Sequence, residues 1–462
     1  MSATQTVSHS SSSNSSIHLN LTQTAAPTGH VAPVTELRDW NASTSQPAAD
    51  TVVEASRIAD ESAPEGGYGW LVVGACSVLT FWFVGTTYSW GVIQDALVES
   101  NLAKPSALAF VGSLAVACNA AFALVNSRLI RAIGARNGAF LGILLLGVGQ
   151  ILSGWATKSL AALFVTEGVI MGYGVSCCFM VASVTPAQYF RKRRGLANGL
   201  VFAGGGLGGA VISLSMSAIV NKLGTEWTFR LIGLITLATG LPAAWLIKER
   251  SPIQATQFIE WKLFRDSRFA VLFVAGTVAT FPLFVPPFFL PLYARSIGQS
   301  AQVGAALVAT FNFSSALGRV LCGLLGDKLG PVNSLFLSLI VSATSMLVLW
   351  PISTSLAPLI VFVVINGMGN GGFFAIMPTV VGNVFGSARV SVAMGMIVTG
   401  WTGGYLLGAP IAGYILEAYG GEKGGFESYR PAIFYAGSMA LAAAGLVAYV
   451  RLRMSKHPSH RL

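Results

Sequence analysis

The sequence predicts an all-α membrane protein in which twelve transmembrane helices form two six-helix pseudo-repeats. Of the 462 residues, 53% are hydrophobic and only 10% are charged, whereas a soluble domain usually carries about 25% charged residues. The apolar residues gather in long segments, and basic residues collect in alternate connections between those segments. With a mean hydropathy of +0.66, the chain cannot cover itself with a water-compatible surface, so lipid is its expected solvent.

The N-terminal segment, residues 1–64, differs from the rest of the chain. It is rich in Ser, Thr, Ala and Pro and lacks the apolar core of a cleavable signal peptide. We expect a disordered cytoplasmic tail, because this composition cannot bury enough apolar surface to fold. Asn14, Asn20 and Asn41 lie in N-x-S/T sequons, which matter only if the tail faces a lumen.

Six candidate spans follow in a first half, residues 65–247, and six more in a second half, residues 269–450. Each has roughly the 20 apolar residues that a helix needs to cross the hydrocarbon core. A polar cytoplasmic linker, residues 248–268, separates the halves, and a basic cytoplasmic tail, residues 451–462, follows them. The predicted spans are residues 70–93, 106–125, 138–156, 160–184, 196–219, 229–247, 269–291, 302–325, 332–350, 356–381, 392–416 and 432–450.

The distribution of basic residues supports this number of spans. With the N-terminus in the cytosol, 20 Lys and Arg residues fall in cytoplasmic segments and 7 in outer segments, as the positive-inside rule requires. We therefore expect both termini in the cytosol. The net charge of +10 is then cytoplasmic loop charge, and no nucleic-acid partner is expected.

The two halves resemble each other weakly at an offset of about 195 residues. Residues 133–137 match residues 329–333 after the second span of each half, and residues 172–174 match residues 367–369 in each fourth span. Two parallel six-helix repeats are a transporter architecture. Chance similarity between glycine-rich helices is the alternative.

Cysteine and histidine give no sign of a metal or cofactor site, so none is expected. Every cysteine lies in an apolar segment without metal-ligand spacing, which favours small packing residues over disulfides or zinc ligands. All five histidines lie in the tails, so a histidine proton relay is not expected. The cysteines are Cys76, Cys118, Cys177, Cys178 and Cys322.

A glycine-rich loop with the sequence GLLGDKLG joins the second and third spans of the second half, from Gly323 through Asp327 to Gly330. It resembles the loop motif of the major facilitator superfamily. The resemblance implies a gate, in which glycines let two helices meet and the Asp pairs with a cation or caps a neighbouring helix. The matching loop of the first half, residues 127–134, has Arg131 in place of the Asp, which weakens the case for a first-half gate lock.

Three further stretches resemble the monocarboxylate porter family of that superfamily, especially its fungal branch. They are EGGYGW at residues 65–70, YFRKRRGLANG at residues 189–199 and NFSSALGR at residues 312–319. The second stretch implies an inner gate element at Arg191, Arg193 and Arg194. Its alternative is a topology anchor that binds anionic headgroups.

The chain departs from the animal lactate carriers of that family at two positions. Val92 stands where they have a Lys near the end of the first span, and Ser315 stands where they have an Asp one turn before the Arg of the eighth span. Proton-coupled lactate transport is therefore not implied. Fungal relatives are similar to carriers of riboflavin, of carboxylic acids or of secondary metabolites.

Two charged residues lie well within predicted spans, away from the span ends, where charge is costly and is a functional hypothesis. Arg319 is expected to face the cavity and to bind an anionic or carbonyl-bearing solute; bonding to backbone carbonyls is the alternative. Glu167 is a candidate for proton coupling, with the proton as coupling ion. Its alternative is a polar contact between helices.

The family resemblance implies that the first, fourth, seventh and tenth spans line the site near the midplane. Aromatic rings there suit a ring-bearing or amphipathic solute, and packing is the alternative for each ring. Besides Arg319, the candidate binding residues are Tyr88, Trp90, Tyr173, Phe284, Asn312, Asn366, Asn370 and Phe373.

These observations predict a secondary active transporter of a small organic anion or amphipathic metabolite, such as a monocarboxylate or a fungal secondary metabolite exported from a biosynthetic cluster. Uptake of a carboxylate or a riboflavin-like vitamin is one alternative, and a non-transporting nutrient sensor is another. An enzyme is not expected, because the spans lack paired acid/base or metal groups. We expect a monomer in the plasma membrane.

Overall fold

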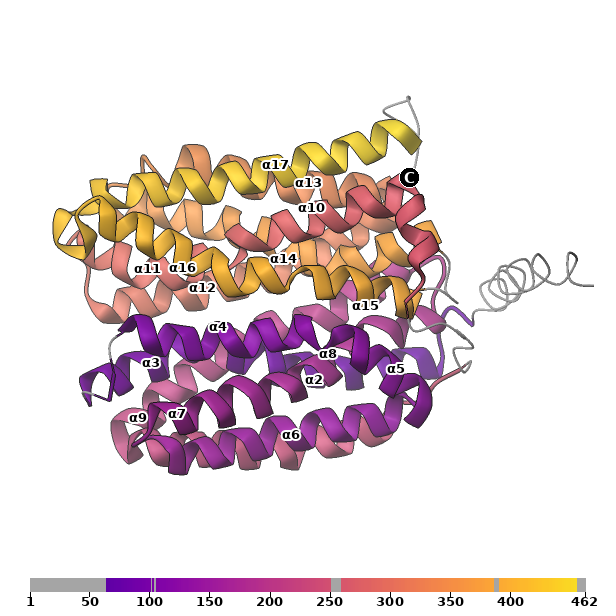
Figure 1. Cartoon of the computed structure of the whole chain (residues 1–462), viewed down its shortest axis with the longest axis horizontal. Coiled ribbons are helices and arrows are strands. Elements are labelled where there is room, and N and C mark those ends of the chain that lie inside the picture. Colours follow the sequence, from indigo (N-terminus) through magenta and orange to yellow (C-terminus); the bar gives the residue numbers. More distant parts are fainter. Residues whose placement is uncertain (1–63, 101, 104, 251–258, 386–389, 455–462) are drawn as a thin grey trace, which may run out of the picture. The chain divides into compact units, whose positions relative to one another are not determined.

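The computed structural model describes residues 64–100, 102–103, 105–250, 259–385 and 390–454. The predicted tails, with the three sequons, lie almost wholly outside the described residues. Helices dominate the described chain, which contains no strand. Figure 1 shows two groups of long, roughly parallel helices, with α2 to α9 in one group and α10 to α17 in the other.

The first group begins in the glycine-rich stretch before the first predicted span and ends at the linker. Its α-helices are α2 Tyr68–Tyr88, α3 Trp90–Glu99, α4 Pro105–Ala121, α5 Ala123–Ile133, α6 Ala135–Ala156, α7 Leu160–Leu163, α8 Gly172–Val184 and α9 Arg194–Leu246. A π-helix, η1 Phe164–Met171, joins α7 to α8, and a 3-10 turn, η2 Pro186–Gln188, follows α8.

The second group follows a 3-10 turn in the linker, η3 Trp261–Arg265. Its α-helices are α10 Ser267–Leu283, α11 Val285–Ser296, α12 Ala301–Leu329, α13 Pro331–Thr344, α14 Leu356–Phe385, α15 Val390–Gly400, α16 Thr402–Ala418 and α17 Arg430–Met454. A π-helix, η4 Ser345–Leu349, extends α13, and the 3-10 turns η5 Gly421–Gly424 and η6 Phe426–Tyr429 precede α17.

The described helices account for twelve membrane crossings. Ten are long and apolar enough to span by themselves, and the bent pair Phe110–Ala121 and Ala123–Ile133 makes an eleventh. Helix α9 has 53 residues, more than twice the roughly 20 that one span needs. Gly224, with φ 79° and ψ 173°, divides α9 into two helical segments, and the second segment is the twelfth crossing. The sequence predicts an outer loop between residues 219 and 229, but the chain is helical on both sides of Gly224. A single residue with positive φ is enough to change the direction of the helix, so no longer loop is needed.

Besides the pair bent at Phe122, three more spans are interrupted partway along their length. The breaks fall at Ser89 between α2 and α3, at Phe284 between α10 and α11, and at Trp401 between α15 and α16. In the second case the cause is visible in the sequence, because Pro286 and Pro287 have no N–H to continue the helical ladder. An aromatic residue lies at or next to each break: Tyr88, Phe284 and Trp401.

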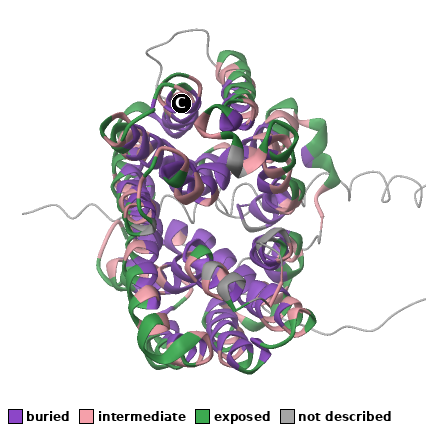
Figure 2. Cartoon of the chain, turned by 90° about the vertical axis from the view of Figure 1, so that its left-hand side faces the viewer, coloured by how far each residue is buried: buried purple, intermediate pink, exposed green. Residues whose placement is uncertain are grey.

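The outside of the bundle is apolar, as a lipid-facing surface should be. Figure 2 shows buried residues inside the bundle and exposed residues around it. Large apolar side chains such as Trp155, Leu214, Trp245 and Leu321 are exposed on single helices. Backbone polar groups inside these helices are bonded within the helix, which lipid demands.

Candidate solute-binding cavity

A cavity of about 30 Å³ lies between the two helix groups, enough for about one water molecule. Seven of its thirteen lining residues are aromatic, and one is charged. The lining residues are Phe83, Val84, Thr87, Tyr88, Val116, Asn119, Val175, Phe179, Phe202, Phe284, Arg319, Phe374 and Tyr405. Both groups therefore contribute to its wall.

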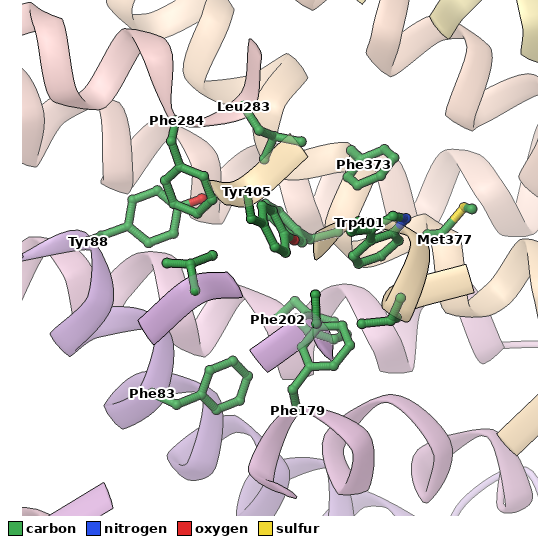
Figure 3. Close-up of a cluster of buried hydrophobic side chains, with 14 of the residues drawn as sticks. Phe83, Tyr88, Phe179, Phe202, Leu283, Phe284, Phe373, Met377, Trp401 and Tyr405 are labelled. Carbon is green, nitrogen blue, oxygen red and sulfur yellow. The ribbon is translucent and has the colours of Figure 1, made fainter. Parts of the chain in front are cut away.

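Aromatic rings form a chain of contacts beside this space. Phe83 and Tyr88, both on α2, are its two ends. From Phe83 the chain runs through Phe179 and crosses to the second group at Trp401, with ring centroids 6.1 and 6.2 Å apart. It returns through Tyr405 and Phe284 to Tyr88, at 6.1, 5.5 and 5.2 Å. Figure 3 shows the rings of the two groups facing each other across the gap.

Arg319 is the only charged residue in the lining, and its side chain is 1% exposed. Its Nη1 donates to the backbone carbonyl of Phe202 at 2.6 Å, and its Cζ lies 5.6 Å from the ring centroid of Phe374. Gly205 makes room for it, since a Cβ there would stand 2.8 Å from Nη1. Arg319 therefore faces a cavity, as the sequence predicts, and it also bonds to a backbone carbonyl, which was the alternative.

Three buried polar atoms of the lining have no hydrogen-bond partner among the described residues. They are Nε of Arg319, the hydroxyl of Tyr88 and Oδ1 of Asn119. Buried polar groups normally have hydrogen-bond partners, so these atoms are available to a bound solute. The lining contains no carboxylate to neutralise the guanidinium. The cavity is therefore suited to an acceptor-bearing, negatively charged group with an aromatic or apolar body.

Two other candidates from the sequence, Tyr88 and Phe284, also line the cavity. Asn370 lies behind Phe284, and its Nδ2 donates to the Leu283 carbonyl at 2.8 Å. That carbonyl would bond the N–H of residue 287 in a continuous helix, but Pro287 has none. Asn370 therefore stabilises the break that presents Phe284 to the cavity.

The remaining candidates lie outside the lining in this conformation. Trp90 donates to the Leu108 carbonyl at 3.1 Å, and Asn366 donates to Ser345 Oγ at 2.8 Å. Phe373 packs against Trp401, with ring centroids 5.3 Å apart. Tyr173 packs edge-on against Phe122, and the buried Asn312 packs at Gly209.

Several lining residues were not among the sequence candidates. They are Asn119, Phe202 and Tyr405 in the second, fifth and eleventh spans, and Phe83 and Phe179 in the first and fourth spans, which the resemblance did imply. The resemblance pointed to other spans for the first three. A weak signal existed for Tyr405, which follows Trp401 by one helical turn.

Glu167 lies in the π-helix η1 and is 3% exposed. Its Oε1 accepts from Gln150 Nε2 at 3.0 Å and its Oε2 accepts from Ser153 Oγ at 3.1 Å. Both partners belong to α6 of the same helix group, and Glu167 does not line the cavity. A polar contact between helices, the alternative from the sequence, is present.

The gate motif residues gather where α9 begins and α12 ends, which we call the inner end because the basic residues predict it to be cytoplasmic. The carboxylate oxygens of Asp327 accept from the backbone N–H groups of Gly195 and Leu196, both at 2.8 Å. Asp327 thus caps the N-terminus of α9 from the other helix group, which favours a negative charge. Gly323 meets the Gly195 carbonyl closely, and Gly330, with φ 95°, separates α12 from α13.

Two more polar contacts cross between the helix groups at the inner end. Asn198 Nδ2 donates to Thr379 Oγ1 at 2.9 Å, and Arg194 Nη1 donates to Asn383 Oδ1 at 3.2 Å. Arg194 is buried, while Arg191 and Arg193 are exposed. The three predicted arginines thus occupy different environments within one short loop.

Comparison with known proteins places these features in context. Residues 70–313 and 272–461 match the family model described as Major Facilitator Superfamily. The chain is 30% identical over 366 residues to the Aspyridones efflux protein apdF of Emericella nidulans, covering 78% of this chain and 74% of that protein. It is 25% identical over 389 residues to Monocarboxylate transporter 13 of Bos taurus, covering 83% and 89%.

A solved structure has a similar fold. The crystal structure of the human organic anion transporter MFSD10 (TETRAN) matches with a TM-score of 0.65 and covers 83% of this chain and 100% of that one. At 14% sequence identity, this likeness concerns the fold alone.

Proposed function

Because the chain belongs to the Major Facilitator Superfamily, we propose that it carries a small organic anion or an amphipathic metabolite through the cavity beside Arg319. The predicted fold class and the resemblance to the monocarboxylate porter family, with its fungal branch, are confirmed by the relatives. These relatives are transporters, and the chain is a multi-pass membrane protein.

The observation that carries the proposal is the environment of Arg319. A buried guanidinium without a carboxylate in its cavity is costly unless an anion joins it. Its free Nε and the Tyr88 hydroxyl offer two donors, and Asn119 Oδ1 offers an acceptor. The surrounding rings supply the apolar surface that an amphipathic body needs.

Loading of the cavity requires the two helix groups to move apart at one end. A space of about 30 Å³ cannot hold an organic anion. Rocking of two repeats around a fixed central site is how carriers of this architecture work. In the described arrangement Asp327 and Asn198 hold α9 against the second group at the inner end, so the solute would enter or leave there only after these bonds break.

For the direction of transport we propose export of a secondary metabolite, since one relative is named an efflux protein for aspyridones. Uptake of a carboxylate or a riboflavin-like vitamin is the alternative, and a nutrient sensor is the second. We further propose a plasma-membrane monomer with both termini in the cytosol. The proton remains the proposed coupling ion, with Glu167 as its site; transport by Glu167→Gln with an unchanged pH profile would exclude that site.

The proposal is tested by transport in vesicles that contain the purified protein. A panel of labelled aromatic and aliphatic acids is followed across a pH step. For the best acid, Arg319→Ala is expected to lower transport by at least about 30-fold, because loss of a buried charge partner costs about 2 kcal/mol or more. Arg319→Lys should retain part of the activity, and Leu321→Ala, which alters the exposed side of the same helix, should retain all of it.

Normal transport by membrane-inserted Arg319→Ala would overturn this role of the guanidinium. Failure of every acid in the panel, with transport of neutral solutes only, would overturn the substrate class.

A further inference from the structure

A second cavity, of about 230 Å³, lies at the inner end and shares no residue with the first. Its walls come from both helix groups. The first group contributes Arg191, Lys192 and Arg194, and the second contributes Asp327, Thr379 and Asn383. The transport cycle proposed above uses only the contacts between these walls, so the space itself has no assigned occupant.

Hydrogen-bond donors dominate this space. Three cations face one carboxylate, and both oxygens of that carboxylate, Asp327, already accept from backbone N–H groups of α9. The Arg194 guanidinium is held by the carbonyls of Phe190 and Ala187, at 3.0 and 3.2 Å, and by Asn383 Oδ1.

The two remaining cations are held in place by their backbone. Glu65 Oε1 accepts from the N–H groups of Arg191 and Lys192, at 2.7 and 2.6 Å, and Glu65 N donates to the Tyr189 carbonyl at 3.1 Å. Glu65 has a φ of 54°, an uncommon value for a residue with a side chain. The loop is therefore fixed, while the Arg191 and Lys192 side chains make no hydrogen bond or ion pair with any other described residue.

We propose that this inner cavity binds a phosphate monoester. Two adjacent cations without a partner match the charge of nearly −2 that a phosphate monoester carries at neutral pH, and its three oxygens suit several donors at once. A single carboxylate would satisfy one of the two cations. The Asn383 amide, on the opposite wall, can donate from its nitrogen because its oxygen accepts from Arg194.

Occupancy joins the two helix groups at the inner end. The phosphate contacts Arg191 and Lys192 on one side and Asn383 on the other, so it stabilises the arrangement in which both walls are close. The phosphate can belong to a lipid headgroup of the adjacent leaflet or to a soluble metabolite. These two sources share the same chemistry and are separated by the test.

Binding is measured with the full-length protein, without any transport assay, so the result is independent of the proposed solute. In one arm, glycerol 1-phosphate is titrated by calorimetry into protein in zwitterionic lipid nanodiscs, at ionic strength matched with sodium chloride. In the other, the thermal midpoint is compared between nanodiscs with and without phosphatidic acid. Binding in the first arm indicates a soluble ligand, and a raised midpoint in the second indicates a lipid headgroup.

Three variants locate the site. The double variant Arg191→Gln/Lys192→Gln is expected to weaken binding at least 10-fold, and Asn383→Asp should do the same from the other wall by adding a negative charge. Lys328→Gln removes an exposed cation next to Asp327 but outside the cavity, and should bind as the wild type does. The double variant and Lys328→Gln should keep the ligand-free thermal midpoint of the wild type.

The proposal is overturned if neither phosphate source binds. It is also overturned if the double variant binds normally, or if Lys328→Gln loses as much affinity as the double variant, which would indicate general attraction to a basic surface. A double variant with a lowered ligand-free midpoint leaves the decision to Asn383→Asp, whose normal binding would equally overturn the site.

Discussion

The two repeat-related loops, residues 127–134 and 323–330, are tied to the bundle in different ways. The residues that follow each loop bond to the end of their own half: Ala135 N donates to Glu249 Oε1, at the start of the linker, at 2.9 Å, and Arg451 Nε of α17 donates to Asn333 Oδ1 at 2.5 Å. Across the halves they differ. The second loop caps α9 through Asp327, whereas Nη1 of Arg131 in the first loop has no hydrogen-bond partner in the described part of the chain.

On the first-half side, the inner end is closed by close packing of helices instead. Gly395 of α15 lies so close to α5 that a Cβ would stand 3.1 Å from Ser127 Oγ. One side of the inner end is thus held by charged, directional bonds and the other by close packing of small residues. Repeats with the same fold can therefore close one gate by different kinds of contact, and four changes test this difference.

The largest effect is expected at the charged side. Asp327→Ala leaves two N–H groups at the start of α9 without their acceptor, which costs about 2 kcal/mol. Amide exchange at Gly195 and Leu196 should therefore accelerate roughly 30-fold in hydrogen–deuterium exchange. Asp327→Asn, which keeps one acceptor oxygen, should show a smaller acceleration. Unchanged exchange in Asp327→Ala would mean that the cap does not hold the gate.

A smaller effect is expected at the packed side. Gly395→Ala introduces a methyl group against Ser127, and overpacking of this kind costs about 1 kcal/mol or more. The matched control is Gly403→Ala in the same span, where no atom lies within 4 Å of a new Cβ. The thermal midpoint of Gly395→Ala should lie below that of the control. Equal midpoints would show that the two helices are not in close contact at this point.

The third test concerns the first loop's tie to its own half. Burial raises the pKa of Glu249 above its ordinary value of 4.5, and the N–H of Ala135 opposes this only in part. The folded state therefore binds the proton more tightly than the unfolded chain. This stabilisation is full below pH 4.5 and is lost as pH rises through the raised pKa. Glu249→Gln should flatten the pH dependence of the thermal midpoint in that window. An identical slope in wild type and variant would contradict a raised pKa.

The smallest effect is expected for Arg131→Ala. The change removes no hydrogen bond between the halves among the described residues, so it should shift stability by less than about 0.5 kcal/mol, as surface substitutions usually do. Measured beside Asp327→Ala by exchange at the inner end, it gives the direct contrast between the two loops. A shift as large as that of Asp327→Ala would show that the first loop also carries a lock.

The sequence was sufficient for features that depend on local chemistry. Twelve spans follow from apolar length, Arg319 stands out as a charge in an apolar run, and Asp327 is readable from its glycine-flanked loop. The sequence was insufficient wherever two distant segments decide the outcome. No pattern places Tyr405 opposite Tyr88, and Asn370 is indistinguishable from a binding residue until Leu283 is seen to lack its helical partner.

The same limit applies to Glu167. A lone acidic residue in a span predicts a function, because burying its charge in the membrane is costly. Its hydrogen bonds to Gln150 and Ser153, however, depend on how α6 is rotated against η1. Likewise, four successive basic residues, from Arg191 to Arg194, look equivalent in sequence. Only the turn into α9 buries the last one and leaves the first two facing the inner cavity.

Charge recognition by Arg319 is tested most directly by equilibrium binding of one pair of ligands to the purified protein. The pair consists of the best acid from the transport panel and its neutral methyl ester. Wild-type protein should bind the acid at least 10-fold more tightly than the ester, because one charge-assisted hydrogen bond contributes about 1.5 kcal/mol or more. In Arg319→Ala the two should bind alike. Equal affinity for acid and ester in the wild type would contradict an anion site at this guanidinium.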